Sequence, residues 1–389
     1  MSTVASPLPH PSAFGRLQCI DMLRAVASQL LVWHHLAFYG PLADVAYPLA
    51  PVMLDWLGDP ARFVVQVFLV IGGFGTAQHL ARLPAAGWRP FCREIVQRYR
   101  RIGIPYVAML PVAIGANALA GRWMEHHSIS AAPTLAQLVA HALFAQDLLC
   151  YEPLTAGIWY LAIDFQLFVL TLAVAMLARR STRVDGTARP ARALALTQSL
   201  LAVPAVLSLF WFNRDPAFDC WAFYYLGSYF LGMLVHWFLA GGLRGPALCG
   251  YLGLAIAAVA VDWRPRLLVA VATAVVILVA AQRERLRTWP MGRLLGSLGI
   301  DYLGRISFSL FLIHFPVCLV VSSWLSQWPL TPGQALAGMV AAWGASLLLA
   351  IVFHHVVERP CWRRPACGSP TASAGCTEFG RIKTRVVTT

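Results

Sequence analysis

The chain has 389 residues, of which 59% are hydrophobic and only 12% are charged, too little charge to cover a soluble protein of this size. This composition argues against a soluble enzyme, a disordered regulator and a disulfide-stapled secreted module, and it favours an integral membrane protein. The 30 basic and 17 acidic residues leave a net charge of +13, but the basic residues lie in short clusters between apolar runs, which is typical of cytoplasmic loops rather than of a nucleic-acid-binding surface.

The apolar runs predict an all-α fold, a polytopic membrane helix bundle of about ten transmembrane helices. A spanning helix needs about 20 mostly apolar residues. The first run carries Asp21 and Arg24 near its start and no cleavage site follows it, so we expect a retained anchor rather than a signal peptide. The ten runs are residues 19–39, 63–83, 102–120, 157–178, 193–212, 221–239, 246–261, 267–281, 302–325 and 335–356.

Arginine clusters fall in every second connection between these runs. Because cytoplasmic loops are rich in Lys and Arg, this alternation predicts that both ends of the chain are cytoplasmic. Residues 134–149 are also apolar, but a span there would reverse every later connection, so we interpret them as an interfacial or re-entrant helix. We expect a cytoplasmic segment over 1–18, a transmembrane domain over 19–360 and a cytoplasmic, disordered tail over 361–389.

Ionisable residues near the ends of the first and third runs are candidates for function, because such groups are costly inside a membrane. Arg24 and His35 are eleven residues apart, which places them on one helix face and roughly 16 Å apart along it. Arg98 and Arg101 share a face, and paired guanidinium groups suit phosphates. Topology signals and interfacial anchoring would also explain these four residues.

Polar residues in three later runs are further candidates. Asp164 lies about two turns inside the fourth helix, where a carboxylate needs a partner or water. Ser307 and His314 share a face, but about 10 Å of helical rise between them excludes a direct hydrogen bond. Glu358 could pair with one of the three arginines or form a simple ion cluster at a helix end. The nine cysteines show no CxxC spacing, so we expect no metal site.

The order of these residues resembles the motifs of the acyltransferase-3 family of integral membrane O-acyltransferases, from about residue 17 to 360. A family stretch WSLSVEEQFY is matched at Trp159, Leu161 and Gln166, but Asp164 and Phe165 stand where two glutamates are usual. The four matching motifs are Ile20-Asp21-x-Leu23-Arg24-Ala25 followed by His35, then Arg98-x-x-Arg101 with Pro105, then the stretch from Gly304 to His314, and last Glu358-Arg359-Pro360.

The resemblance implies a multi-pass enzyme of the bacterial inner (plasma) membrane that acylates surface polysaccharide. It implies acyl-CoA, commonly acetyl-CoA, as donor substrate, no bound cofactor, and a carbohydrate or glycolipid acceptor at the outer side. Arg24, Arg98 and Arg101 would then bind the donor. His35 would act as general base or as a covalent acyl relay, and Asp164 would orient its imidazole. Supporting roles fall to Ser307, His314, Glu358, Gln166 and Trp159.

The competing function is a proton-coupled transporter of small solutes that uses the same buried Arg, Asp and His residues. We see no matching pair of helices broken by Gly or Pro in two halves of the chain, which would have favoured transport. The sequence does not choose between direct transfer and an acyl-histidine relay, and it names neither the acceptor, the acyl chain nor the oligomeric state.

Overall fold

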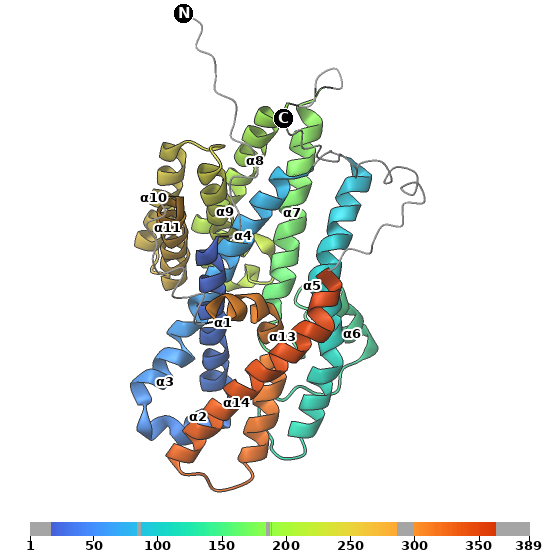
Figure 1. The fold of residues 1–389 in the computed structure, drawn as a ribbon, viewed down its shortest axis with the longest axis vertical. Helices are drawn as coiled ribbons and strands as arrows, with labels where there is room; N and C mark the ends of the chain where they lie inside the picture. The colour runs from blue at the N-terminus through green and yellow to red at the C-terminus, as the bar shows by residue number, and fades with distance from the viewer. Residues whose placement is uncertain (1–16, 84–86, 184–186, 188, 286–298, 363–389) are drawn as a thin grey trace, which may run out of the picture.

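The computed structural model describes residues 17–83, 87–183, 187, 189–285 and 299–362, and these form a bundle of helices (Figure 1). The cytoplasmic segments expected over 1–18 and 361–389 therefore lie almost wholly outside the described residues. The long helices are α1 (Gln18–Tyr39), α4 (Val65–Ala81), α5 (Trp88–Ala120), α7 (Trp159–Ser181), α8 (Pro190–Phe210), α9 (Ala222–Leu239), α10 (Gly245–Val261), α11 (Pro265–Arg285), α13 (Ile300–Leu325) and α14 (Pro332–Phe353).

Shorter helices lie in the connections and at the C-terminal end of the described chain. Thr331 shows how the sequence starts a helix here: its side chain and that of Gln334 form a reciprocal capping box in front of α14, and Pro332 occupies the first turn. The short helices are α2 (Pro41–Ala46), α3 (Pro51–Gly58), α6 (Leu135–Ala142) and α15 (Arg359–Trp362), with 3₁₀ turns at Tyr47–Leu49, Pro60–Val64, Phe212–Arg214 and Pro216–Phe218 and a π-helix at His354–Glu358.

The prediction of an all-α, polytopic membrane bundle is confirmed, because eight helices in the described ranges are long and apolar enough to cross a membrane. Each of the ten predicted runs forms a helix. Two of these helices, α1 and α10, are not among the eight: α1 carries the polar residues of the first motif, and α10 has only 17 residues. The number of spans and the orientation of the termini stay predictions.

Two connections differ in detail from what the apolar pattern indicates. Residues 134–149 contain α6, which is only 8 residues long, or about 12 Å at 1.5 Å per residue, too short to span a bilayer. The third helix, α5, starts at Trp88 rather than at residue 102 and runs for 33 residues. Hydropathy misses its first turns because they are polar, although nothing in them breaks a helix.

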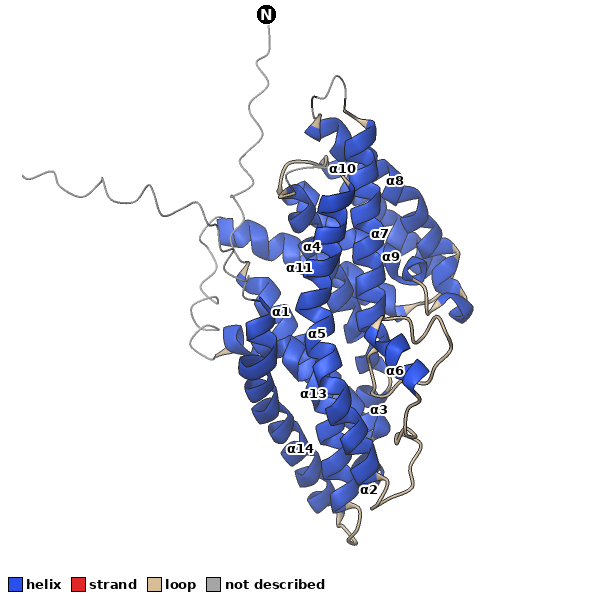
Figure 2. Ribbon diagram, turned by 90° about the vertical axis from the view of Figure 1, so that its right-hand side faces the viewer, coloured by secondary structure: helices blue, strands red, loops and turns tan. Residues whose placement is uncertain are grey.

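The helices divide between two apolar cores that meet at the centre of the bundle. One core is built mainly from α4, α7, α8, α9, α10 and α11, and the other from α1, α5, α13 and α14. Within the second core α13 packs between α1 and α14, and the side view shows α13 and α14 next to each other (Figure 2). Helices α1, α4, α5, α7 and α13 therefore border the space between the cores.

Two glycines let the backbones of α4 and α9 touch. A Cβ atom on Gly73 would lie 1.8 Å from the carbonyl oxygen of Tyr229, and one on Gly232 would lie 1.9 Å from that of Val70. Small residues at helix interfaces permit this close approach in membranes, where dispersion contacts hold helices together.

Gly232→Ala should lower stability by about 1–3 kcal/mol, because the added methyl group forces the two backbones apart. The thermal unfolding midpoint of the detergent-purified protein measures this loss. Gly253→Ala on α10 is the matched control, since a Cβ there meets no atom within 4 Å. Equal midpoints for the two variants would show that α4 and α9 separate without cost.

Candidate functional site

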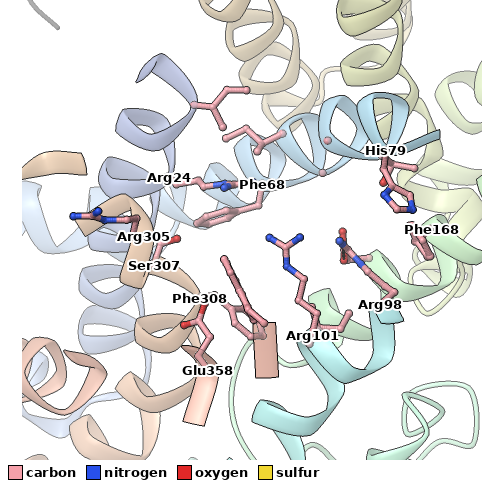
Figure 3. A pocket seen from close by; sticks show the side chains of 18 of the residues that line it. Arg24, Phe68, His79, Arg98, Arg101, Phe168, Arg305, Ser307, Phe308 and Glu358 are labelled. Carbon is pink, nitrogen blue, oxygen red and sulfur yellow. Dashed lines mark hydrogen bonds and ion pairs between the residues drawn. The ribbon is translucent and has the colours of Figure 1, made fainter. Parts of the chain in front are cut away.

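A cavity of about 1340 Å³ lies between the two cores (Figure 3). Its wall comes from α1, α4, α5, α7 and α13 and from the segment after α14. Arg98 and Arg101 reach into it from α5, while Arg24 approaches from α1 on the other side. The cavity therefore brings Arg24 of the first motif together with Arg98 and Arg101 of the second, which follow it by 74 or more residues in the sequence.

The lining of the cavity is strongly cationic. Carboxylates are outnumbered, so the cavity favours an anionic ligand, and guanidinium forks can each hold a phosphate or carboxylate with two hydrogen bonds. The lining arginines are Arg24, Arg82, Arg93, Arg98, Arg100, Arg101, Arg305 and Arg359, and the lining carboxylates are Asp21, Glu94, Asp164 and Glu358.

Asp164 pairs with Arg98 across the interface of α7 and α5. The Arg98 guanidinium also lies over the Phe168 ring, with 5.1 Å between its central carbon and the ring centroid. The expected contact between Asp164 and His35 is therefore wrong. A carboxylate in an apolar helix takes the nearest cation, and the register of α5 places Arg98, rather than a histidine, opposite it.

The Nε atom of Arg98 is buried and has no hydrogen-bond partner among the described residues. Its neighbour on the same face, Arg101, stacks over the ring of Trp362 with 4.2 Å between its central carbon and the ring centroid. The two arginines are thus oriented by different contacts, a carboxylate for one and an aromatic face for the other. Both remain in the cavity lining.

Glu358 ends a π-helix, a rare local widening that often marks functional sites. Its carboxylate accepts hydrogen bonds from Ser309 and, at 2.9 Å, from Nδ1 of His354. Of the two alternatives that the sequence leaves open, the cluster at the helix end is formed, because the π-turn brings His354 onto the same face. Its second oxygen is buried and has no hydrogen-bond partner among the described residues.

His35 lies beside His314 rather than in the arginine-lined cavity. Nδ1 of His35 is 2.7 Å from Nε2 of His314, and the two rings lie edge to edge with centroids 4.9 Å apart. Both side chains are buried, at 6% and 0% exposure. The adjacent His34 points elsewhere, with its Nδ1 2.8 Å from the carbonyl oxygen of Leu57.

An aromatic wall separates the histidine pair from the cavity. Phe68, Tyr160 and Phe311 line the cavity, and the Tyr160 ring meets Phe311 at 5.9 Å and Phe68 at 6.0 Å between centroids. Gly157 lies between this wall and His35: a Cβ there would lie 3.2 Å from Cε1 of His35 and 3.5 Å from Phe311. The histidine thus sits one aromatic layer beyond the cavity.

His35 also lines a second, small cavity of about 10 Å³. Tyr39, Ser128 and Phe315 share this lining, and all of it lies toward the C-terminal end of α1, whereas Arg24 is near the N-terminal end. His35 therefore borders this small cavity on the side away from Arg24.

The remaining predicted residues divide between the cavity and the outer bundle. Ser307 lines the cavity and donates to the carbonyl of Gly304 at 2.9 Å. Gln166 lies elsewhere, where its amide joins α7 to the start of α9 through Cys220 and Ala222. Trp159 stacks on a tyrosine ring of α9. These last two hold helices together.

Several lining residues escaped the sequence analysis. The aromatic wall was missed because Phe and Tyr are ordinary in membrane helices. His79 and Glu94 form a hydrogen bond of 2.9 Å in the lining, and only the histidine within an apolar run could have signalled it. Across the described ranges, no three His, Cys, Asp or Glu side chains are grouped as metal ligands would be.

Comparison with known proteins adds one finding to this geometry. A family model described as an acyltransferase domain matches residues 17–355. That range contains the whole aromatic wall, the histidine pair and the three motif arginines. No curated protein and no solved structure matches the chain.

Proposed function

Because the chain belongs to the acyltransferase-3 family and is a multi-pass membrane acyltransferase, we propose that it moves an acyl group from acyl-CoA to a hydroxyl of a carbohydrate or glycosylated acceptor at the outer side of the inner membrane. The family match supports acyl transfer in general. The donor, the acceptor and the direction of transfer are proposed from the two cavities and the residues between them.

The arginine-lined cavity is the observation that carries the donor assignment. Ligand pockets usually measure about 300–1,000 Å³, so a cavity of about 1340 Å³ has room for a long ligand such as a coenzyme A thioester. Arg24, Arg98 and Arg101 would bind its phosphates. The arginine alternation along the chain predicts that this end of the bundle is cytoplasmic, where acyl-CoA is made.

His35 is the proposed general base. Neutral imidazole removes protons near neutral pH, and the small cavity beside His35 lies on the side away from the arginines. The thioester would reach His35 past the aromatic wall, and the hydroxyl would come from the other end. Direct attack by the hydroxyl and a covalent acyl-histidine both remain compatible with this arrangement.

Mass spectrometry of surface glycans from cells with and without the gene tests the proposal. We expect one glycan component to lose a single acyl mass, 42 Da for acetyl, when the gene is deleted, and to regain it on complementation. The mass difference names the acyl group and the component names the acceptor. Identical glycan profiles, together with solute uptake that depends on the gene, would favour the transporter instead.

Membrane vesicles of opposite orientation test the donor side. Coenzyme A thioesters do not cross a bilayer, so inverted vesicles should release free coenzyme A from external acetyl-CoA while right-side-out vesicles should not. Vesicles from the deletion strain are the control. Release by right-side-out vesicles alone would place the arginine-lined cavity at the outer face and overturn the direction of transfer.

A further inference from the structure

We propose that His314 is a positioning residue for His35: it accepts the Nδ1–H hydrogen bond of His35 and so leaves Nε2 as the basic nitrogen. This inference rests on the proposed function, in which His35 is the base. It assigns to a second histidine the task that a carboxylate performs in Ser-His-Asp hydrolases.

The hydrogen bonds of the pair fix where the protons lie. Nδ1 of His314 is 2.9 Å from the carbonyl oxygen of Leu310, and a carbonyl can only accept, so this nitrogen carries the proton. Nε2 of neutral His314 is then an acceptor. Since it lies 2.7 Å from Nδ1 of His35, that nitrogen is the donor, and the lone pair of His35 is on Nε2.

Packing holds the two rings in this arrangement. The rings of His35 and His314 lie edge to edge with 21° between their planes, as an N–H···N hydrogen bond requires. Phe315 and Tyr39 pack against His35 at steep angles, with 6.0 and 5.4 Å between centroids. A Cβ atom on Gly157 would lie 3.2 Å from Cε1, the carbon between the two nitrogens, so only glycine leaves the ring its place. A side chain held on so many sides keeps one rotamer, which is what positioning of a base requires.

The two motif carboxylates that could have accepted the hydrogen bond of His35 have other partners. Asp164 pairs with Arg98, and Glu358 accepts from Ser309 and His354. His314 itself is fully buried, and a buried polar side chain that reaches from α13 to α1 costs desolvation unless its hydrogen bonds are made. Both ring nitrogens of His314 are satisfied, one by a backbone carbonyl and one by His35.

The proton balance of direct transfer is consistent with this pair. The acceptor O–H gives its proton to Nε2 of His35 while the oxygen forms a bond to the thioester carbon. The C–S bond then breaks, and the proton passes from Nε2 to the departing sulfur, which leaves as a thiol. Throughout, the Nδ1–H of His35 stays hydrogen-bonded to His314, which stabilises the transient imidazolium.

Two substitutions at position 314 separate the two hydrogen bonds. Gln places an amide group where Nε2 of histidine lies, so His314→Gln retains an acceptor for His35. Asn places its amide where Nδ1 lies, so His314→Asn retains the donor to Leu310 and loses the contact with His35. We expect His314→Gln to keep turnover within about tenfold of the parent and His314→Asn to lose about 10²-fold, the low end for loss of base function.

The assay is release of coenzyme A from acetyl-CoA by inverted membrane vesicles that contain the native acceptor. The loss should fall on kcat, with KM for acetyl-CoA unchanged, because neither variant touches the arginine-lined cavity. Parent-like turnover of His314→Asn, or equal losses in both variants, would overturn the positioning role. His35→Ala in the same assay separates the two hypotheses, since normal turnover there would refute the base itself.

Discussion

Replacement of His35 by alanine should abolish acyl transfer and leave the protein inserted and folded. Loss of a general base costs typically 10²–10⁴-fold in rate, which a glycan assay would register as complete loss. The side chain is buried against His314 and Gly157, so a small loss of stability is also expected. Acyl content of the glycan and coenzyme A release from inverted vesicles measure the first effect, and the thermal midpoint measures the second.

His34→Ala is the matched control, because the two histidines are adjacent, equally buried and on the same helix. His34 donates to the carbonyl of Leu57 and ties α1 to α3. Its removal should cost about 0.5–1.5 kcal/mol of stability, the net value of a hydrogen bond, and little activity. If His35→Ala were active and His34→Ala inactive, the face of α1 that carries His34, rather than the face that carries His35, would be the reacting one.

The second large effect is expected at the ion pair of Asp164 and Arg98. Asp164→Asn should destabilise the protein strongly, since removal of one member of a buried pair typically costs about 3–5 kcal/mol. Asp164 is 7% exposed and Arg98 22%, so the lower end of this range applies. Donor binding should weaken as well, because Arg98 loses the contact that holds it in the cavity wall. The thermal midpoint and the KM for acetyl-CoA measure the two consequences.

A double-mutant cycle gives this prediction its control. Arg98→Gln combined with Asp164→Asn removes both charges, so the double variant should be more stable than Asp164→Asn alone, while acyl transfer stays low. Additive losses of stability would show that the two side chains do not interact. Asp164→Asn with parent stability and unchanged KM would show that the pair contributes neither to the fold nor to the proposed donor site.

The sequence predicted the helices well because apolar length is a local property. Every predicted run forms a helix, and the Arg24 to His35 spacing correctly separates a group near one end of α1 from a group near the other. The start of α5 was predicted too late because its first turns are polar, and polar residues are equally compatible with a loop. Hydropathy reports where a helix is buried in lipid, and it does not report where the helix begins.

The partners of the polar residues could not be predicted in the same way. Periodicity says which face a side chain occupies, but not which helix lies opposite that face. Asp164 was expected to meet His35 and meets Arg98, 66 residues away; His35 meets His314, 279 residues away. The motif match identified these polar residues as candidates for function, but it did not identify their contact partners. Only the packing of α1 against α13 and of α5 against α7 decided among them.

Gly157 has a consequence for how a large acceptor could be used. It has φ +80°, a left-handed conformation that favours glycine. It lies at the end of the long connection after α5, where an added Cβ would be 3.2 Å from Cε1 of His35. An acceptor that binds this connection would press on the histidine through the glycine backbone. Binding energy gained far from the reacting hydroxyl would then serve to align the base, so a shortened acceptor should lose turnover rate as well as affinity.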